Sequence, residues 1–369
     1  MGYQMRVVLA HGGDVSVPSG GHERVVAFAS GLVRAGHDVT LVVPEPDGTL
    51  PDRLDGVAVR TVGVPTGGVR TQPRRGLAVA RTARRVADAS GARLQVEHST
   101  LGGLASLFSD GYVLDVHDVA HTSPLYRDRP LGGVLSTGVR WLEGRGLRSA
   151  GTVVVVSERM REFVVEEWDV SREAITVIPN GYFEDDVTSV VPDTNEGTRV
   201  VFVGTLHPKL DIDAVVESAR LDAVDQLLVI GDGAMRDELA RAKRQRGLET
   251  LSMPGRLSTR ETWSLVAGAD VAINPQTESP TQTVSSPVKL CYYRALGVPM
   301  VLSDGPELAR RFAEAGVARL IEPEQSFPRV LETLLADRTE LEAMRSRAGR
   351  SDGCVPWRDR AETLCRVFD

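Results

Sequence analysis

Two glycine-rich turns in this sequence have the composition of phosphate-binding loops. The first follows the first apolar run and reads HGGDVSVPSGG, so that Gly20 and Gly21 open the helical pattern behind it. The second, Gly231-Asp232-Gly233, follows an apolar run in the other half of the chain. Free backbone N–H groups and the positive end of a helix dipole attract phosphate at such turns. Glycine also serves tight turns that bind nothing, and the GxGxxG spacing of dinucleotide enzymes is absent.

A third candidate is the helix start Ser285-Ser286-Pro287-Val288-Lys289. Proline is favoured at the first helical turn, where its missing N–H costs nothing, and either serine can cap the helix. The lysine adds a cation beside the free N–H groups, which suits a diphosphate. An ordinary capped helix has the same residues, so this site depends on its surroundings.

His117 is the candidate for chemistry at a sheet edge. It directly follows the apolar run 112–116. In open parallel sheets, ligands bind at the carboxyl ends of the strands, which would place His117 at the site. His98, behind the run 94–96, supports a weaker version of the same argument. The alternative for both is a structural histidine.

No metal centre is predicted. Asp211 and Asp213 form a DxD pair, which could hold a metal ion, but here the pair begins a helical pattern and is interpreted as a helix cap. Cys291, Cys354 and Cys365 have neither metal-ligand nor CxxC spacing. A sparse, odd number of cysteines fits a reducing cytosol without structural disulfides.

The charge pattern argues against nucleic acid as a partner and leaves an anionic membrane as a candidate. A net charge of −7 argues against nucleic-acid binding. Residues 56–87 nevertheless contain seven arginines and no acid, and the cluster from Arg70 to Arg85 reads as one side of an amphipathic helix. Such a helix can lie on an anionic membrane, although a solvated helix face looks the same. No apolar run reaches the ~18 residues needed to span a bilayer. We therefore expect a cytoplasmic protein, peripheral on the inner face of the membrane if the cluster binds lipid.

The elements that must position these residues alternate between strand and helix. Apolar, β-branched runs separated by helical patterns predict βαβ units and parallel sheets buried on both faces. The predicted strands are 6–10, 39–43, 57–62, 94–96, 112–116, 153–156, 175–178, 200–203, 227–230, 271–274, 300–302 and 319–321; the helical patterns include 23–35, 77–89, 158–168, 213–220, 235–245, 289–296 and 357–368. The chain of 369 residues exceeds one ordinary core, and an acidic, polar stretch interrupts the alternation near residue 184. The predicted fold is α/β, with two Rossmann-like domains whose parallel sheets face each other across a cleft.

Four stretches resemble, in order, the motifs of glycosyltransferases of the GT-B fold, family 4. They are residues 19–24 continuing to 36–39, 155–158 continuing to 177–181, 202–206 with Lys209, and 286–290 continuing to 295–299. The resemblance implies an acceptor domain over 1–184, a linker over 185–197 and a nucleotide-sugar donor domain over 198–355. It also implies that the final helix, within 356–369, packs back on the first domain.

What the resemblance implies about activity is sugar transfer from a nucleotide sugar to a glycan, lipid-linked or small-molecule acceptor. Such transfer usually retains the anomeric configuration and needs neither a metal ion nor a cofactor. His117 would contact the reacting sugar. The implied donor-binding residues are Gly20, Gly21, Thr205, Lys209, Gly231, Asp232, Gly233, Arg256, Pro287, Val288, Lys289 and Tyr292.

The sequence departs from the family pattern at three donor positions. Thr205 stands where the family usually has arginine, and Val284 and Tyr292 stand where it has two glutamates. A tyrosine hydroxyl cannot accept two hydrogen bonds as a carboxylate does, so Glu278 on a nearby loop is a possible replacement as a sugar contact. Two alternatives stay open: a catalytically degenerate partner subunit, and a sugar-nucleotide epimerase or hydrolase.

Overall fold

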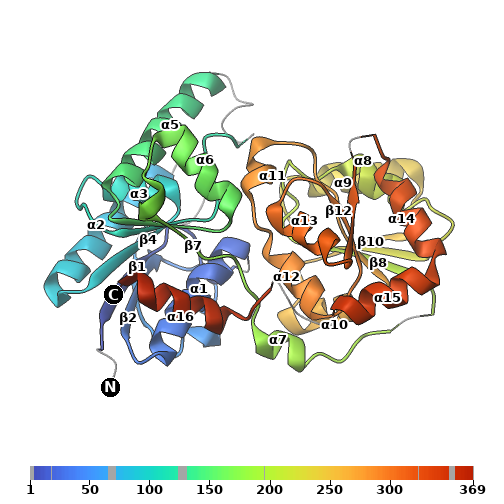
Figure 1. Ribbon diagram of the computed structural model, residues 1–369, viewed down its shortest axis with the longest axis horizontal. Helices are drawn as coiled ribbons and strands as arrows, with labels where there is room; N and C mark the ends of the chain where they lie inside the picture. Colours follow the sequence, from blue (N-terminus) through green and yellow to red (C-terminus); the bar gives the residue numbers. More distant parts are fainter. Residues whose placement is uncertain are drawn as a thin grey trace. The chain divides into compact units, whose positions relative to one another are not determined.

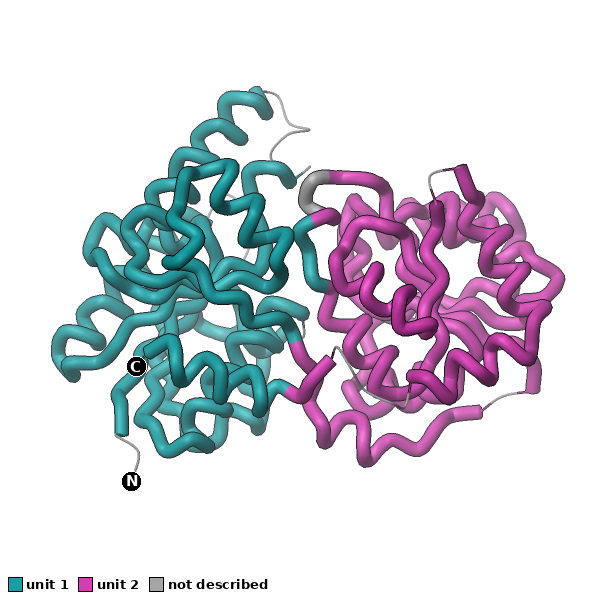
Figure 2. Tube along the Cα trace, viewed as in Figure 1, with its two compact units in different colours: residues 1–180, 284–286, 357–369 teal, residues 181–283, 287–356 magenta. Residues whose placement is uncertain are grey.

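The computed structural model describes residues 4–17, 19–64, 72–123, 131–194, 196–322, 324–348 and 354–368. The chain forms two compact units (Figure 2). Unit 1 comprises Met1–Asn180, Val284–Ser286 and Trp357–Asp369, and unit 2 comprises Gly181–Thr283 and Pro287–Pro356.

Unit 1 is built on a seven-stranded parallel sheet in the order β3-β2-β1-β4-β5-β6-β7 (Figure 1). Its strands are β1 (Arg6–Ala10), β2 (Asp38–Pro44), β3 (Ala58–Val62), β4 (Arg93–Glu97), β5 (Val113–Val116), β6 (Thr152–Val155) and β7 (Ile175–Val177). Its helices are α1 (Gly20–Arg34), α2 (Gln72–Ser90), α3 (Ser99–Ala105), α5 (Gly132–Ser149), α6 (Glu158–Trp168) and α16 (Trp357–Phe368), with short 3₁₀ turns at Asp52–Leu54 and Arg172–Ala174.

The core of unit 1 follows from the two-residue period of its strands. Alternate strand side chains, among them Val8, Val96 and Val155, join one cluster with apolar residues of α2, α3, α5 and α6. The helices α1 and α16 pack on each other. Gly31 and Ala361 make this approach close, because a Cβ on Gly31 would lie only 2.2 Å from that of Ala361.

Unit 2 is built on a six-stranded parallel sheet in the order β10-β9-β8-β11-β12-β13. Its strands are β8 (Arg199–Val203), β9 (Gln226–Ile230), β10 (Leu251–Gly255), β11 (Val271–Asn274), β12 (Met300–Ser303) and β13 (Ala318–Ile321). Its helices are α7 (Glu184–Thr188), α8 (Ile212–Ser218), α9 (Arg236–Arg246), α10 (Thr259–Ala267), α11 (Pro280–Val284), α12 (Val288–Ala295), α13 (Glu307–Glu314), α14 (Phe327–Ala336) and α15 (Arg338–Ala348). The prediction of two parallel-sheet α/β units is confirmed.

A short helix begins at the predicted linker. Helix α7 occupies Glu184–Thr188, at the start of the predicted linker 185–197. Its first turn carries Glu184, Asp185 and Asp186, and carboxylates at a helix N-terminus are favoured by the dipole. An acidic stretch therefore starts a helix where composition alone indicates a linker.

Candidate functional site

Two glycine turns meet at the carboxyl ends of β8 and β9 in unit 2. Gly204, Gly231 and Gly233 have φ values of 140°, 141° and 156°, a conformation that other residues rarely adopt. A Cβ on Gly231 would lie 2.0 Å from the Gly204 carbonyl oxygen. The Leu206 amide donates to the Asp232 carbonyl at 3.0 Å. The sequence therefore needs glycine here because the two turns pack backbone against backbone.

Lys289 projects from α12 beside these turns. Its Nζ lies 3.9 Å from the centre of the Phe202 ring, and 3.3 Å from where a Cβ on Gly204 would be. Burial and the positive charge of Lys209 lower the pKa of Lys289 to about 7. Among the described residues no carboxylate offsets these two effects. Two lysines with no acidic partner beside a glycine turn are suited to a polyanion.

The start of α12 differs in detail from the sequence prediction. A serine cap was expected from Ser285 or Ser286, but the capping position is Pro287, which makes no side-chain hydrogen bond. A proline cap cannot satisfy the first N–H groups of the helix through a side chain. Val288, the first helical residue, is buried. The capping prediction is wrong, because the residue at the capping position is Pro287 rather than a serine.

The other predicted donor residues of unit 2 lie at different depths. Thr205 is exposed on the turn that follows β8, and Arg256 is exposed behind the edge strand β10. The carbonyl of Lys209 accepts a hydrogen bond from the Thr277 amide at 2.9 Å. Glu278, also exposed, is the next residue, so its loop is tied directly to Lys209. Asp232 uses its carboxylate to accept the Gly233 amide at 2.8 Å.

Tyr292 and Val284 are both core residues. Tyr292 is 1% exposed and stacks on Trp263 with ring centres 4.0 Å apart. Its hydroxyl accepts from the Phe183 amide at 3.2 Å and lies 3.3 Å from a carboxylate oxygen of Asp186. Val284 belongs to the apolar cluster of unit 1. The hydroxyl of Tyr292, which the resemblance assigned to donor binding, is thus already engaged inside unit 2.

Asp211 has the role that the sequence predicted. Its carboxylate accepts a hydrogen bond from the Ala214 amide at 2.9 Å and caps α8. The DxD pair therefore serves a helix start, and the capping prediction is confirmed.

In unit 1, His117 lies at the end of β5 against the first turn of α1. A Cβ on Gly21 would come within 2.9 Å of His117 Nε2, so glycine is required for this approach. Burial lowers the pKa of His117 to about 4, and the nearby charge of Asp115 offsets only part of this effect. The imidazole is neutral at pH 7. Gly20 is exposed in the same turn.

A buried ion pair between Arg24 and Asp115 lies close to His117. Arg24 donates from Nε and Nη2 to both carboxylate oxygens of Asp115, at 2.6 and 2.8 Å, and both side chains are inaccessible to solvent. Burial and the neighbouring Asp115 raise the pKa of Glu97 well above its usual range. Glu97, Asp115 and His117 form the one group of possible metal ligands found among the described residues. Arg24 already neutralises this group, because it occupies both oxygens of Asp115.

Sequence reasoning missed two further histidines. His11 and His22 lie with ring centres 5.1 Å apart, and His98 and His117 lie 5.6 Å apart. His11 follows β1 and His98 follows β4, so the signal for His11 was the same strand-end position used for His117. His98 caps α3, where its Nδ1 accepts the Thr100 amide.

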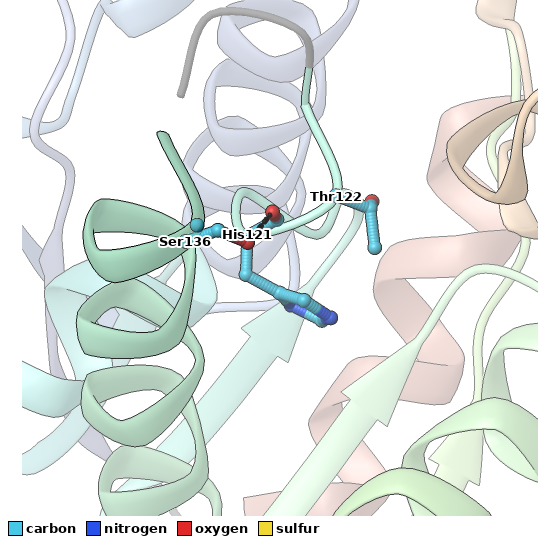
Figure 3. A pocket seen from close by; sticks show the side chains of 4 residues that line it. His121, Thr122 and Ser136 are labelled. Carbon is cyan, nitrogen blue, oxygen red and sulfur yellow. Dashed lines mark hydrogen bonds between the residues drawn. The ribbon is translucent and has the colours of Figure 1, made fainter. Parts of the chain in front are cut away.

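A pocket of about 460 Å³ lies between the loop after β5 and the first turns of α5. Its lining includes His121, Thr122, Gly133 and Ser136 (Figure 3). The Ser136 hydroxyl donates to the His121 carbonyl at 2.6 Å, and His121 Nδ1 lies 2.7 Å from a carboxylate oxygen of Glu143. Burial alone would raise the pKa of Glu143, but hydrogen bonds from His121, Ser99 and the Ala120 amide hold it below its usual value. Hydrogen bonds therefore hold the His121 side chain and backbone at this pocket.

Comparison with known proteins agrees with this architecture. Residues 19–181 match the family model for a glycosyl transferase 4-like domain, and residues 197–337 match the model for glycosyl transferases group 1. WaaG, a glycosyltransferase involved in lipopolysaccharide biosynthesis, has a similar structure, with a TM-score of 0.77 at 15% identity over 98% of this chain and 99% of its own. HepE of Anabaena, solved in complex with UDP-glucose, gives 0.76 at 15% identity over 99% of each chain.

A sequence relative is the Bacillus subtilis (strain 168) glycosyltransferase TuaH, named for teichuronic acid biosynthesis. It is 24% identical over 215 residues, which cover 56% of this chain and 54% of TuaH. The match thus spans about half the length of that curated relative. Two parallel α/β units with these matches define a glycosyltransferase of the GT-B fold. The chain belongs to the family 4-like glycosyltransferases.

A substitution at Gly21 tests its contact with His117. Gly21→Ala is expected to lower turnover at least tenfold, because the new methyl group displaces the imidazole. The folded protein should lose some stability, because overpacking against His117 costs ~1–3 kcal/mol, whereas alanine favours a helix over glycine by only ~0.5–1 kcal/mol. Turnover and thermal unfolding are compared with those of Gly138→Ala, a helical glycine with no neighbour within 4 Å of its Cβ position. Equal turnover in both variants would contradict the predicted role.

Proposed function

We propose that this protein transfers a sugar from a nucleotide-sugar donor, held by unit 2, to a glycan or lipid-linked acceptor, held by unit 1. The observation that carries this proposal is the pair of uncompensated lysines, Lys209 and Lys289, beside the Gly204 and Gly231–Gly233 turns. The leaving group of such a transfer is a nucleoside diphosphate. Stabilising its developing negative charge is the main catalytic requirement, and fixed cations and N–H groups supply it.

Retention and independence of metal ions are part of the same proposal. The family pattern favours both, and the lysines and the first turn of α12 take the charge-neutralising role that a divalent cation has elsewhere. His117 would contact the reacting sugar from unit 1. The uncharged state of its imidazole at pH 7 suits a hydrogen bond to a hydroxyl better than a contact with phosphate.

The test is a turnover assay. The protein is incubated with a panel of nucleotide sugars and candidate acceptors, and free nucleotide and the anomeric configuration of the product are measured, with and without a chelator. We expect chelator-insensitive turnover that falls strongly in His117→Ala and in Lys209→Ala. Undiminished turnover in both variants would refute the site assignment.

A second candidate is a glycosyltransferase-like partner subunit without activity. Tyr292 and Val284 favour it, because both stand at positions where the family has glutamates and both are buried. Calorimetry with UDP and other nucleoside diphosphates separates the two candidates. Absence of any nucleotide binding would favour the partner subunit, and release of free nucleotide without an acceptor would indicate a hydrolase.

We further propose that unit 1 rests on an anionic membrane. Arg70 lies outside the described residues, but Arg74, Arg81 and Arg85 are exposed on α2. The apolar contribution comes from α5 and the residue before it: Leu131, Val134, Leu135 and Trp141 are 77%, 71%, 45% and 61% exposed. The carboxylate of α5, Glu143, is buried. Among the described residues, no helix has the length and apolar character to cross a bilayer.

Co-sedimentation with liposomes tests this surface. The double variant Val134→Ser/Trp141→Ser should bind vesicles containing phosphatidylglycerol several-fold less, because each apolar side chain loses its transfer free energy. Binding should also fall with salt, by screening of the arginines. Val191→Ser in unit 2 is the matched control, since Val191 is also 71% exposed. Equal binding of neutral and anionic vesicles would contradict the proposal that this surface binds an anionic membrane.

A further inference from the structure

Four imidazoles gather at the carboxyl ends of three neighbouring strands of unit 1. His11, His98 and His117 follow β1, β4 and β5, which are adjacent in the sheet, and His22 lies on α1. The rings pair edge to face, His11 with His22 and His98 with His117. His117 has a role in the proposed transfer, His98 caps α3, and His22 Nδ1 bonds the Val17 carbonyl, so His11 is the member of the cluster that needs an explanation.

His11 is the most informative member of this histidine cluster. Its side chain is 6% exposed, and neither ring nitrogen has a hydrogen-bond partner among the described residues. Nδ1 of His117 is also buried and has no hydrogen-bond partner among the described residues. The His11 amide is fixed to the Val42 carbonyl at 3.0 Å, so the residue is held in place. Buried polar atoms are nearly always paired, which indicates that a ligand pairs with these nitrogens when it is bound.

The charge state of the cluster selects the kind of ligand. Burial and the neighbouring histidines lower the pKa of His11 well below its usual range, and His117 is also neutral at pH 7. A neutral imidazole offers one donor and one acceptor, and each hydroxyl of a sugar offers both. An anion would require cations instead. Uncharged vicinal hydroxyls therefore match this cluster, whereas phosphate matches the lysines of unit 2.

A hydrogen bond to the backbone fixes the orientation of the His22 ring. His22 Nδ1 lies 2.6 Å from the Val17 carbonyl oxygen and donates a hydrogen bond to it. Nε2 of His11 and Nε2 of His22 lie 2.8 and 2.5 Å from the Cβ position of Gly13. Both atoms are thus directed at the Gly13 backbone, where a larger residue would displace them.

A metal ion is the competing occupant of a histidine cluster. The possible metal ligands whose donor atoms lie within 4.8 Å of one another, among the described residues, are Glu97, Asp115 and His117, and His11 is not one of them. Metal binding through several imidazoles needs ring nitrogens converging at about 2.0–2.1 Å on one point. The histidine cluster as placed does not offer that convergence.

We propose that His11, together with His117, forms a subsite that hydrogen-bonds the hydroxyls of a pyranose sugar. This inference rests on the proposed function for the identity of the ligand. The sugar belongs either to the donor or to the acceptor, since both carry the same hydroxyl chemistry. His11 is assigned as a binding residue for that sugar.

The test uses His11→Phe, which keeps a ring of similar shape and removes both nitrogens, and His11→Gln, which restores one donor and one acceptor. His37→Phe is the matched control, because His37 precedes β2 at the opposite, amino end of the strands. The probes are UDP, UDP-glucose and methyl α-glucoside, with their galactose and N-acetylglucosamine counterparts. Calorimetry measures the nucleotides, and saturation-transfer NMR measures the glycosides.

If the donor sugar occupies the subsite, His11→Phe leaves UDP affinity unchanged and weakens UDP-glucose or its counterpart about tenfold, which equals about 1.4 kcal/mol. If the acceptor sugar does, both nucleotides are unaffected and the affinity for the glycoside falls about tenfold. In either case His11→Gln recovers part of the loss. The melting temperature of His11→Phe should rise, because two unpaired buried nitrogens are removed.

Unchanged affinity for every sugar, or an equal loss for UDP and UDP-glucose with a lower melting temperature, overturns the inference. A chelator-sensitive loss does so as well, because it would identify a metal site. Failure of the transfer proposal has a different signature. In that case no nucleotide sugar binds, while glycoside binding and its dependence on His11 persist.

Discussion

Lys289→Met is expected to weaken the proposed nucleoside diphosphate binding, measured with UDP as the probe, by about a hundredfold or more while making the folded protein more stable. Charge-assisted hydrogen bonds contribute ~1.5–3 kcal/mol each, and a diphosphate offers acceptors for two of them. Their loss corresponds to roughly 10²–10⁴ in affinity. Stability moves in the opposite direction, because burial and Lys209 disfavour the ammonium in the free protein. Methionine keeps the length of the side chain and its packing on Phe202.

The pH dependence gives this prediction a second readout. The pKa of Lys289 is about 7 in the folded protein, against 10.5 in an unstructured chain. Between these two pH values the unfolded chain binds one more proton than the folded protein does. The free energy of unfolding of the wild type therefore rises by about 1.4 kcal/mol per pH unit. Bound diphosphate favours the ammonium form, so UDP binding takes up a proton at pH 8.5 and none at pH 6. UDP affinity therefore falls as the pH rises above 7.

Calorimetry in buffers of different ionisation heat measures proton uptake, and urea unfolding at several pH values measures stability. Lys289→Met should lose both the uptake and the stability slope. The matched control is Lys243→Met, which removes a lysine at the end of α9, away from the glycine turns. Wild-type UDP affinity in Lys289→Met, or a loss of stability, would show that this lysine is a packing residue.

The sequence predicted the fold well where local signals and the tertiary structure agree. The alternation of apolar runs and helical patterns identified both sheets, and β1 has the predicted bounds Arg6–Ala10. Strand β10 was missed, because Pro254 and Gly255 argue against a strand. The structure tolerates them since β10 is an edge strand with a register shift.

Helix α5 was missed for a related reason. Glycine disfavours helices, and this one contains several. Two positions explain the composition: a Cβ on Gly146 would lie 2.4 Å from the Gly103 amide nitrogen, and a Cβ on Gly103 would lie 2.2 Å from the Leu142 carbonyl oxygen. Close packing of α3 on α5 requires these glycines. That requirement is tertiary, so the helical pattern alone does not show it.

The same physical reasons decide which features of the candidate site the sequence could indicate. Glycine turns and the start of α12 are local features, and the sequence located them. The environment of Tyr292 is not local, because Trp263 and Phe183 reach it from other elements. The unpaired nitrogens of His11 are likewise visible only when burial is known. Strand-end position was the signal that could have identified His11.

Arg24→Met is expected to destabilise unit 1 by about 3–5 kcal/mol, the largest stability effect predicted for this chain. Removing one partner of a buried ion pair leaves the other charge uncompensated, and both side chains here are fully inaccessible. Arg24 also donates from Nη1 to Asn180 at 3.0 Å, and Asn180 donates to the Ser286 carbonyl at 2.6 Å. The substitution therefore releases α1 and the segment 284–286 together.

The acid dependence of this variant has a definite sign. Burial would raise the pKa of Asp115, but Arg24 outweighs burial and lowers it. A lowered carboxyl pKa stabilises the folded state above the unfolded value of about 3.9, and this contribution is lost as the pH falls through the folded pKa. In Arg24→Met, Asp115 and Glu97 instead share a site without a cation. The difference in the free energy of unfolding between the variant and the wild type is then largest at neutral pH, and it becomes smaller towards pH 3.

Hydrogen exchange of the β1 and β5 amides in urea measures unit 1 separately from unit 2. Arg84→Met is the matched control: its partner Asp88 is exposed, and such a pair contributes under about 1 kcal/mol. The double variant Arg24→Met/Asp115→Leu should recover most of the loss, because apolar residues can replace a buried pair. If the double variant is as unstable as Arg24→Met, the hydrogen bond to Asn180 carries the effect. In that case Arg24→Gln, which can still donate to Asn180, should recover more stability than the double variant does.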